Sequence, residues 1–212
     1  MACHTEFCHT DPAAYWDSVH RGKEPSTTSW YETAPATSLA VLDALGVNRN
    51  DRMLDVGAGA RGLAGPLLQR GFRHVSALDV SHAALQAARD ELAGRAGKVE
   101  WIVTNVVDWR PPHRWDVWHD RAVFHFLPDD EQRKRYRRVL EQAVVPGGAV
   151  VVATFAADGP QQCSGLPTSR YDAGELAAAL GDGLEPVVTR RVEHRTPGGN
   201  LQPFTYLGLR RR

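Results

Sequence analysis

Three kinds of feature are scarce in this chain of 212 residues, and each scarcity excludes a class of protein. There are only three cysteines, and no charged-then-apolar segment opens the chain as a secretory signal does. We therefore expect reduced thiols in a cytoplasmic protein, not a disulfide framework. No apolar run approaches the roughly 18 residues of a membrane span, so no membrane association is expected. The 25 basic and 25 acidic side chains balance, so no overall field favours nucleic acid.

Two local clusters carry no predicted function. Cys3-His4 and Cys8-His9 have side chains that can bind soft metals, but their spacing matches no standard zinc motif. We expect a disordered N-terminus there and no metal site. The basic run at 133–138 is expected to be a solvated helix face.

Strands and helices alternate along most of the chain. Apolar segments predict strands at 52–56, 74–79, 98–103, 115–120 and 148–155, and helical patterns predict helices at 38–45, 61–70, 81–94, 129–144 and 172–180. Such alternation is typical of a parallel α/β sheet with helices on both faces. Two last strands, at 185–193 and 202–210, flank a Pro-Gly-Gly-Asn turn, so the sheet should end antiparallel. Residues 1–37 are expected to form an extension to a main domain at 38–212.

A glycine-rich turn follows the first predicted strand. Asp55 ends that strand, and Gly57 and Gly59 let the backbone approach a ligand because they have no Cβ. Asp79 ends the next strand, where an acid can accept hydrogen bonds from both hydroxyls of a ribose. The pattern indicates a cofactor that contains adenosine. With Gly62 it also matches the dinucleotide motif, but Asp55 would repel a pyrophosphate and suits a cationic cofactor instead.

The segment Leu54-Asp55-Val56-Gly57-Ala58-Gly59 resembles the first motif of class I S-adenosylmethionine-dependent methyltransferases. The resemblance implies S-adenosyl-L-methionine as cofactor. It also implies a Rossmann-like, seven-stranded, mostly parallel sheet with an antiparallel C-terminal strand over 38–212. Ligands of such sheets bind at the carboxyl ends of the strands, which predicts the cofactor residues Asp55, Gly57, Gly59, Asp79, Asn105, Val106 and Asp120. Trp30 is added to this set as a residue that closes over the cofactor. The family usually carries an acid where this chain has Asn105, whose oxygen can still accept a hydrogen bond from adenine. The alternative for Asn105 is an ordinary loop residue.

Polar side chains also follow the later strands. Asp120 and Arg121 form either a structural ion pair or part of the methyl-transfer face, and His125 is either a base or a core residue. The dipeptide Asp120-Arg121, a Gly-x-Pro segment and a histidine near the last hairpin resemble the thiopurine methyltransferase-like group, which methylates sulfur, selenium or halide acceptors. We therefore predict a small thiol or sulfide acceptor, such as methanethiol or hydrogen sulfide. Alternatives are a protein lysine N-methyltransferase and a non-catalytic S-adenosylmethionine-binding module.

The predicted catalytic residues are expected to converge on one small pocket, with His119 as the first choice for the base: His119, His194, Arg121, His125 and Arg170. Cys163 is either a packed filler or part of a site for a soft acceptor. The aromatic residues Trp16, Trp30 and Tyr31 either staple the N-terminal segment to the sheet or form a lid that excludes water.

Overall fold

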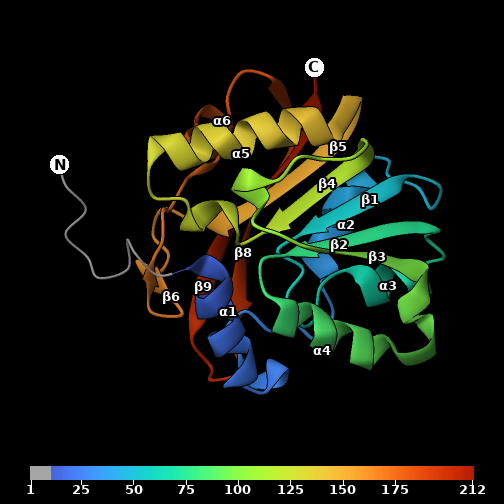
Figure 1. The fold of residues 1–212 in the computed structure, drawn as a ribbon. Helices are drawn as coiled ribbons and strands as arrows, with labels where there is room; N and C mark the ends of the chain where they lie inside the picture. Colours follow the sequence, from blue (N-terminus) through green and yellow to red (C-terminus); the bar gives the residue numbers. More distant parts are fainter. Residues whose placement is uncertain (1–10) are drawn as a thin grey trace.

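The computed structural model describes residues 11–212, so Cys3-His4 and Cys8-His9 lie outside the described part. Seven strands form one sheet in the order β3-β2-β1-β4-β5-β9-β8 (Figure 1). Their bounds are β1 Arg52–Val56, β2 His74–Asp79, β3 Val99–Val103, β4 Trp115–Arg121, β5 Val144–Phe155, β8 Leu184–Arg195 and β9 Leu201–Arg211. The pairs from β3 to β5 are parallel, and β9 is antiparallel to both β5 and β8. The predicted fold class is confirmed.

Helices cover both faces of this sheet (Figure 1). On one face pack α2 (Ala36–Ala44), α3 (Ala64–Gln69) and α4 (His82–Leu92), and on the other α5 (Asp130–Ala143) and α6 (Ala173–Leu180). Side chains alternate between the faces along each strand. In β1, Met53 joins the first apolar cluster and Leu54 joins the second. Both faces are thus buried, as a parallel sheet requires.

Several element ends differ from those predicted. The helix expected at 61–70 begins only at Ala64, because residues 57–63 form the tight turn after β1. The strand expected at 148–155 begins at Val144, where it already pairs with Trp115 across an irregularity in the register. Three short 3₁₀ turns lie between β2 and α5 among the described residues: η3 Ala93–Lys98, η4 Val106–Asp108 and η5 Phe124–Phe126.

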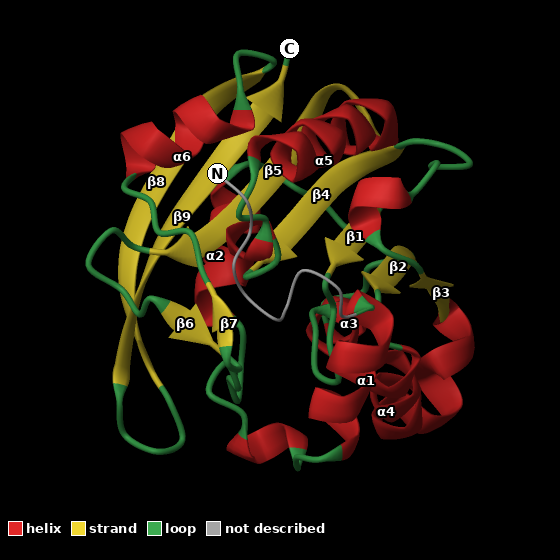
Figure 2. Cartoon of the chain, turned by 60° about the vertical axis from the view of Figure 1, so that its left-hand side comes forward, coloured by secondary structure: helices red, strands yellow, loops and turns green. Residues whose placement is uncertain are grey.

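The extension at the N-terminus folds back on the main domain. Asp11 caps α1 (Pro12–Arg21), and the turn η2 (Pro25–Thr27) follows. Helix α1 lies beside α4 (Figure 2), where the carboxylate of Asp17 accepts hydrogen bonds from the hydroxyl of Ser81 at 2.7 Å and the backbone of Ala83 at 3.0 Å. A small hairpin that was not predicted, β6 (Gln162–Cys163) with β7 (Leu166–Pro167), forms within the segment between β5 and α6.

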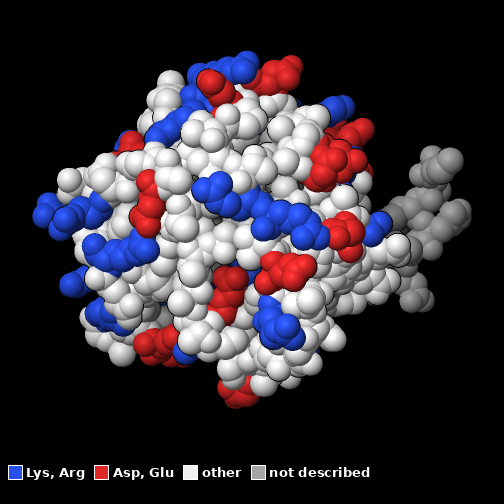
Figure 3. Space-filling model, turned by 180° about the vertical axis from the view of Figure 1, so that it is seen from behind, with Lys and Arg blue, Asp and Glu red and all other residues white. Residues whose placement is uncertain are grey.

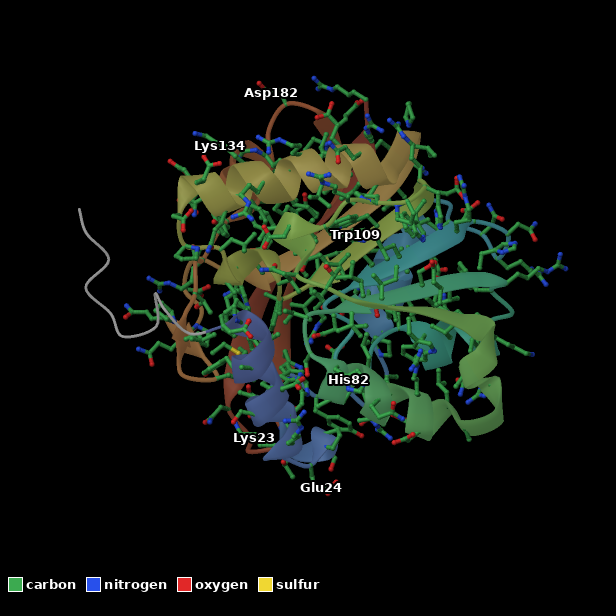
Figure 4. All side chains as sticks on the ribbon, viewed as in Figure 1. Lys23, Glu24, His82, Trp109, Lys134 and Asp182 are labelled. Atoms are coloured by element: carbon green, nitrogen blue, oxygen red, sulfur yellow. The ribbon has the colours of Figure 1, made fainter. Side chains whose placement is uncertain are left out.

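The surface carries charges of both signs side by side. Lys and Arg are interspersed with Asp and Glu over the face in Figure 3. Lys134, on α5, points outward, as Figure 4 shows, and Arg133 pairs with Asp130 at 2.6 Å. No helix among the described residues is long and apolar enough to cross a membrane.

Candidate active site

A cavity of about 970 Å³ opens at the carboxyl ends of β1, β2 and β4. Its floor is the turn after β1, and its roof is α1 together with the segment at 28–35, which we call the strap. Cavities that hold small ligands measure roughly 300–1,000 Å³, so this one has room for a cofactor and an acceptor together.

The glycine turn brings backbone against the cavity. Gly57 and Gly59 have φ of 67° and 61°, a region that side-chain-bearing residues rarely adopt. A Cβ on Gly57 would lie 2.0 Å from Cγ2 of Val123, and one on Gly62 would lie 2.5 Å from Oδ2 of Asp55. Gly57 is therefore required by close packing and by conformation, Gly59 by conformation, and Gly62 by close packing.

Asp79 lies at the end of β2 and lines the cavity. One carboxylate oxygen accepts from the backbone N–H of Gly59 and the other from that of Ser81, both at 2.8 Å. Burial raises the pKa of Asp79 to about 6, although these hydrogen bonds oppose the shift. The carboxylate keeps accepting capacity that a ribose hydroxyl can use.

Asn105 and Val106 line the same cavity after β3. The side-chain oxygen of Asn105 accepts from the backbone N–H of Val107 at 3.3 Å and so caps η4. The loop role and the ligand role are compatible, because an amide oxygen accepts two hydrogen bonds and the amide nitrogen remains a donor.

Asp55 and His119 are neighbours across the β1–β4 register and touch through their side chains. Nδ1 of His119 lies 2.7 Å from Oδ1 of Asp55, and Nε2 lies 2.9 Å from the hydroxyl of Ser38 in α2. The other oxygen of Asp55 accepts from the backbone N–H of Leu63 at 2.7 Å. All three side chains are buried at the cavity floor, and both ring nitrogens of His119 have partners inside the protein.

Asp120 and His125 do not line this cavity. The carboxylate of Asp120 is fully buried and accepts from the backbone N–H groups of Val123 and Phe124 and from the phenol of Tyr136, at 2.8, 3.1 and 2.6 Å. It anchors the turn after β4 and makes no ion pair with Arg121. His125 is also fully buried, accepts from the backbone of Phe155 through Nδ1, and burial lowers its pKa to about 3. Of the two alternatives for His125, the structure therefore supports a core residue and not a base.

Arg170 and His194 do not converge with His119, so the expectation of a single pocket was wrong. Arg170 is exposed and donates to the carbonyl of Gly159. His194 lines a separate hollow of about 370 Å³, and its Nε2 donates to the carbonyl of Ser29 at 2.8 Å.

Arg121 does line the cavity, but its guanidinium holds the strap. It donates to the carbonyl of Trp30 at 3.1 Å and to the phenol of Tyr206 at 3.0 Å, and it pairs with Glu32 at 3.1 Å. Glu32 in turn lies 3.6 Å from Nδ1 of His194. Arg121 and His194 thus fasten the strap to the ends of β4 and β8.

The roof brings a histidine that the sequence analysis missed. His20 lies on α1 with ring centroids 6.3 Å from Trp16 and 6.0 Å from Trp30, and all three residues line the cavity. Its ring approaches the glycine turn, 3.9 Å from where a Cβ on Gly59 would be. Burial lowers the pKa of His20, and within residues 11–212 its ring nitrogens make no hydrogen bond. The helical spacing of Trp16 and His20, four apart on one face, was the available signal.

The rest of the acceptor side is apolar. Phe126 lies edge-on to Trp16 at 5.1 Å, and Cys163 and Leu166 of the β6–β7 hairpin complete the wall. Cys163 is buried, and burial raises the pKa of its thiol, so the group is neutral at physiological pH. No group of three or more potential metal ligands occurs among the described residues.

Comparison with known proteins agrees with this arrangement. Residues 53–148 match the family model described as a methyltransferase domain. No curated protein matches the sequence. Among solved structures, one described by the conversion of a disulfide bond into a thioacetal group during echinomycin biosynthesis is 23% identical, with 94% of this chain and 92% of that chain covered and a TM-score of 0.74.

Two further structures are N-methyltransferases. The 1,6-didemethyltoxoflavin-N1-methyltransferase of Burkholderia thailandensis, solved with its substrate and S-adenosylhomocysteine, is 24% identical over 93% of this chain and 85% of that chain, with a TM-score of 0.72. NodS of Bradyrhizobium japonicum, with S-adenosylhomocysteine, is 14% identical over 93% of this chain and 98% of that chain, with a TM-score of 0.70. Residues 53–148 therefore resemble a methyltransferase domain, and the described chain has the fold of solved methyltransferases; this similarity supports S-adenosylmethionine as the cofactor.

Proposed function

We propose that this protein transfers the methyl group of S-adenosylmethionine to the sulfur of a small neutral thiol or to sulfide. The observation that carries this proposal is the character of the acceptor side of the cavity. Its wall consists of the rings of Trp16, Trp30 and Phe126 with Cys163 and Leu166. A soft, apolar nucleophile fits such a wall without burying an unpaired charge.

The charges around the cavity disfavour a lysine acceptor. A cationic lysine requires a free carboxylate, but the acidic side chains that line the cavity away from Asp55 and Asp79 are engaged. Glu32 pairs with Arg121, Glu91 pairs with Arg61 at 2.7 Å, and Asp129 caps α5. This arrangement favours a neutral acceptor over a protein lysine.

The residues on the floor suit the parts of the cofactor in order. Asp55 and the glycine turn would hold its cationic methionine end, Asp79 its ribose, and Asn105 with the backbone of Val106 its adenine. When bound, the cofactor supplies an electrophilic methyl group on a sulfonium. The protein then has to position the acceptor, exclude water and receive one proton.

We propose that a ring nitrogen of His20 accepts the proton of the thiol. Because burial lowers the pKa of His20, its ring is neutral at pH 7 and keeps a free lone pair. The thiol gives its proton to this nitrogen, the new sulfur–carbon bond forms, and the bond from the methyl group to the sulfonium breaks. The products are S-adenosylhomocysteine and either a methyl thioether from a thiol or methanethiol from sulfide, and the proton leaves to solvent.

We also propose that residues 1–37 act as a lid. The strap and α1 carry the roof residues Trp16, His20 and Trp30, and fastening at Arg121 and Asp17 would keep water from the sulfonium while the acceptor is bound. Removing this segment should reduce turnover more than it reduces stability.

The test is incubation of the full chain with methyl-labelled S-adenosylmethionine and a panel of sulfide, methanethiol, longer thiols, amines and lysine-containing peptides, followed by mass spectrometry. The relative described by disulfide-to-thioacetal conversion has sulfur chemistry, and the two N-methyltransferases do not, so the amine arm is essential. We expect methyl thioethers from the thiols and methanethiol from sulfide. Labelling of amines alone would overturn the sulfur assignment, and cofactor binding with no turnover would indicate a non-catalytic module.

A further inference from the structure

Three aromatic side chains around the cavity keep part of their surface uncovered. Trp16 of α1, Trp30 of the strap and Phe126 after β4 all line the cavity, and each is only partly buried. The ring centroids of Phe126 and Trp30 lie 5.1 and 6.3 Å from that of Trp16, at interplanar angles of 70° and 79°. Rings that meet at such angles form a corner and do not cover one another as a flat stack would. We call these three residues the aromatic corner.

The aromatic corner borders the same space as the glycine turn. The ring centroid of His20 lies 6.3 Å from that of Trp16 and 6.0 Å from that of Trp30. The Cε1 atom of the same His20 ring is 3.9 Å from where a Cβ on Gly59 would be. The cationic end of the cofactor is proposed to lie on this turn. The corner therefore borders the part of the cavity that would take the sulfonium.

Among the described residues, the roof offers a cation no free carboxylate. Asp17 does not line the cavity, and its carboxylate accepts from the hydroxyl of Ser81 and the backbone of Ala83, at 2.7 and 3.0 Å. Glu32 pairs with Arg121 at 3.1 Å. A cation beside the roof is therefore stabilised by aromatic rings. Such rings attract onium ions, which carry no N–H donor that would need a hydrogen-bond acceptor.

The charge inside the cavity distinguishes two kinds of sulfur acceptor. A thiol loses its proton when it is methylated, so this reaction needs a base and one positive charge leaves the cavity. A thioether has no proton to lose. Its sulfur lone pair forms the bond to the methyl group, and the bond from that methyl group to the cofactor sulfur breaks with its electron pair left on that sulfur. The positive charge moves to the acceptor, so the cavity holds one sulfonium before the transfer and one after it.

We propose that the aromatic corner binds a small sulfonium ion as a product, so that the protein also methylates small thioethers. This inference rests on the proposed function, because it places the thioether on the same acceptor side of the cavity. It adds a second class of substrate, one that requires no base. Dimethyl sulfide, the product expected from methanethiol, is the simplest such substrate, and its methylation gives trimethylsulfonium.

The first measurement is binding without turnover. Trimethylsulfonium is titrated calorimetrically into the full chain saturated with S-adenosylhomocysteine, and tert-butanol serves as a neutral ligand of similar size. We expect trimethylsulfonium to bind more tightly than tert-butanol by about fivefold or more. Equal affinity for the two ligands, or no binding of trimethylsulfonium, would refute a cation site.

Two variants assign this binding to the aromatic corner. Trp16→Leu should raise the Kd for trimethylsulfonium by about 5- to 30-fold, because one ring face is lost to the cation. Phe126→Leu removes a second ring and should weaken the same ligand. The Kd for S-adenosylhomocysteine, which carries no sulfonium, reports whether each variant is folded. Wild-type affinity for trimethylsulfonium in both variants would place the cation elsewhere and overturn the proposal.

Trp101→Leu is the matched control. Trp101 is a partly buried tryptophan of β3 that does not line the cavity, and the guanidinium of Arg89 lies over its ring, 5.4 Å from the centroid. This variant should bind trimethylsulfonium as the wild type does. A loss equal to that of Trp16→Leu would reduce the effect to general destabilisation and count against the corner.

The second measurement is turnover with methyl-labelled S-adenosylmethionine and either methanethiol or dimethyl sulfide, followed by mass spectrometry. We expect the wild type to form trimethylsulfonium from dimethyl sulfide. In His20→Gln the ratio of thioether turnover to thiol turnover should rise by about 10²-fold, because only the thiol needs the base. Methylation of methanethiol without any trimethylsulfonium would overturn this inference and leave the proposed function intact. If neither sulfur acceptor is methylated, the proposed function fails and the inference fails with it.

Discussion

Replacing Asp79 by asparagine should separate cofactor affinity from stability. Asparagine keeps one of the two oxygens that accept from Gly59 and Ser81, so one backbone N–H loses its acceptor, at a cost of about 1–3 kcal/mol. The same substitution removes a buried charge. The pKa of Asp79 is raised from 3.8 to about 6, which corresponds to about 3 kcal/mol of destabilisation by the ionised form at neutral pH. The two effects oppose each other, so the free energy of unfolding at pH 7 should change by less than about 2 kcal/mol.

Affinity should respond quite differently. Hydrogen bonds between a carboxylate and ribose hydroxyls contribute about 1.5–3 kcal/mol each, and Asp79→Asn loses at least one of them. The Kd for S-adenosylhomocysteine should rise by about 10- to 150-fold in calorimetry, while urea unfolding at pH 7 shows little change. Unchanged affinity would refute the ribose assignment, and a loss of several kcal/mol in stability would refute the raised pKa.

The pH dependence has a defined sign. Because the folded-state pKa of Asp79 lies above its unfolded value, its contribution to stability is complete below about pH 4 and is lost as pH rises toward 6. Cofactor affinity should have the opposite trend, because the ribose hydroxyls donate to the ionised carboxylate of Asp79. The affinity should therefore fall as the pH drops through about 6. The stability trend from this group should be absent in Asp79→Asn, while the similar trend from Asp120 remains.

Three further substitutions test the roof, the strap and the turn after β4. His20→Gln should lower kcat/KM by about 10²-fold near neutral pH with cofactor affinity intact, and the loss should shrink at high pH, where the thiol ionises unaided; an equal loss at every pH would assign His20 to packing, and the exposed His74→Gln is the control. Glu32→Gln removes the charge that Arg121 holds, so hydrogen exchange at 28–35 should accelerate and KM should rise; unchanged exchange would contradict the fastening of the strap. Asp120→Ala leaves three donors without an acceptor and should cost about 3 kcal/mol or more in urea unfolding with no change in cofactor Kd.

The sheet was predictable because its signals are local. Strands β1, β2, β4 and β5 contain apolar runs that end at a polar residue or a turn, and the hairpin turn between β8 and β9 is marked by proline and glycine. The start of α3 could not be predicted. The residues after Gly62 have a helical pattern, but the carboxylate of Asp55 accepts a hydrogen bond from the backbone of Leu63 and keeps it in the turn. That contact depends on packing between β1 and α3, which a periodic pattern does not contain.

The different positions of His119 and Asp120 could have been predicted from the alternation of side chains along β4. Side chains alternate along β4, so Val117 joins one apolar cluster and Trp118 the other. His119 and Arg121 follow Val117 toward the cavity, and Asp120 follows Trp118 into the opposite core. Asp120 was predicted among the cofactor residues, but the alternation of side chains along β4 already places it on the other face of the sheet.

The roof could not be predicted in the same way. Arg121 reaches the carbonyl of Trp30 across 91 positions in sequence, and Tyr15 reaches the backbone of Ser164 across 149. Nothing local in either segment signals its partner. Only the folded chain brings α1, the strap and the β6–β7 hairpin around one space.

This division bears on which part of the protein selects the acceptor. The floor residues Asp55, Asp79 and His119 lie inside the segment that matches the methyltransferase model, whereas the roof residues His20 and Trp30 lie outside it. Structures with this fold at 14–24% identity include two described as N-methyltransferases and one described by sulfur chemistry, so the fold does not determine the acceptor atom. Selection must then come from groups that differ between relatives and touch the acceptor. In this chain those groups are the aromatic roof and the hairpin wall, whose lack of a free carboxylate argues for sulfur over a cationic nitrogen.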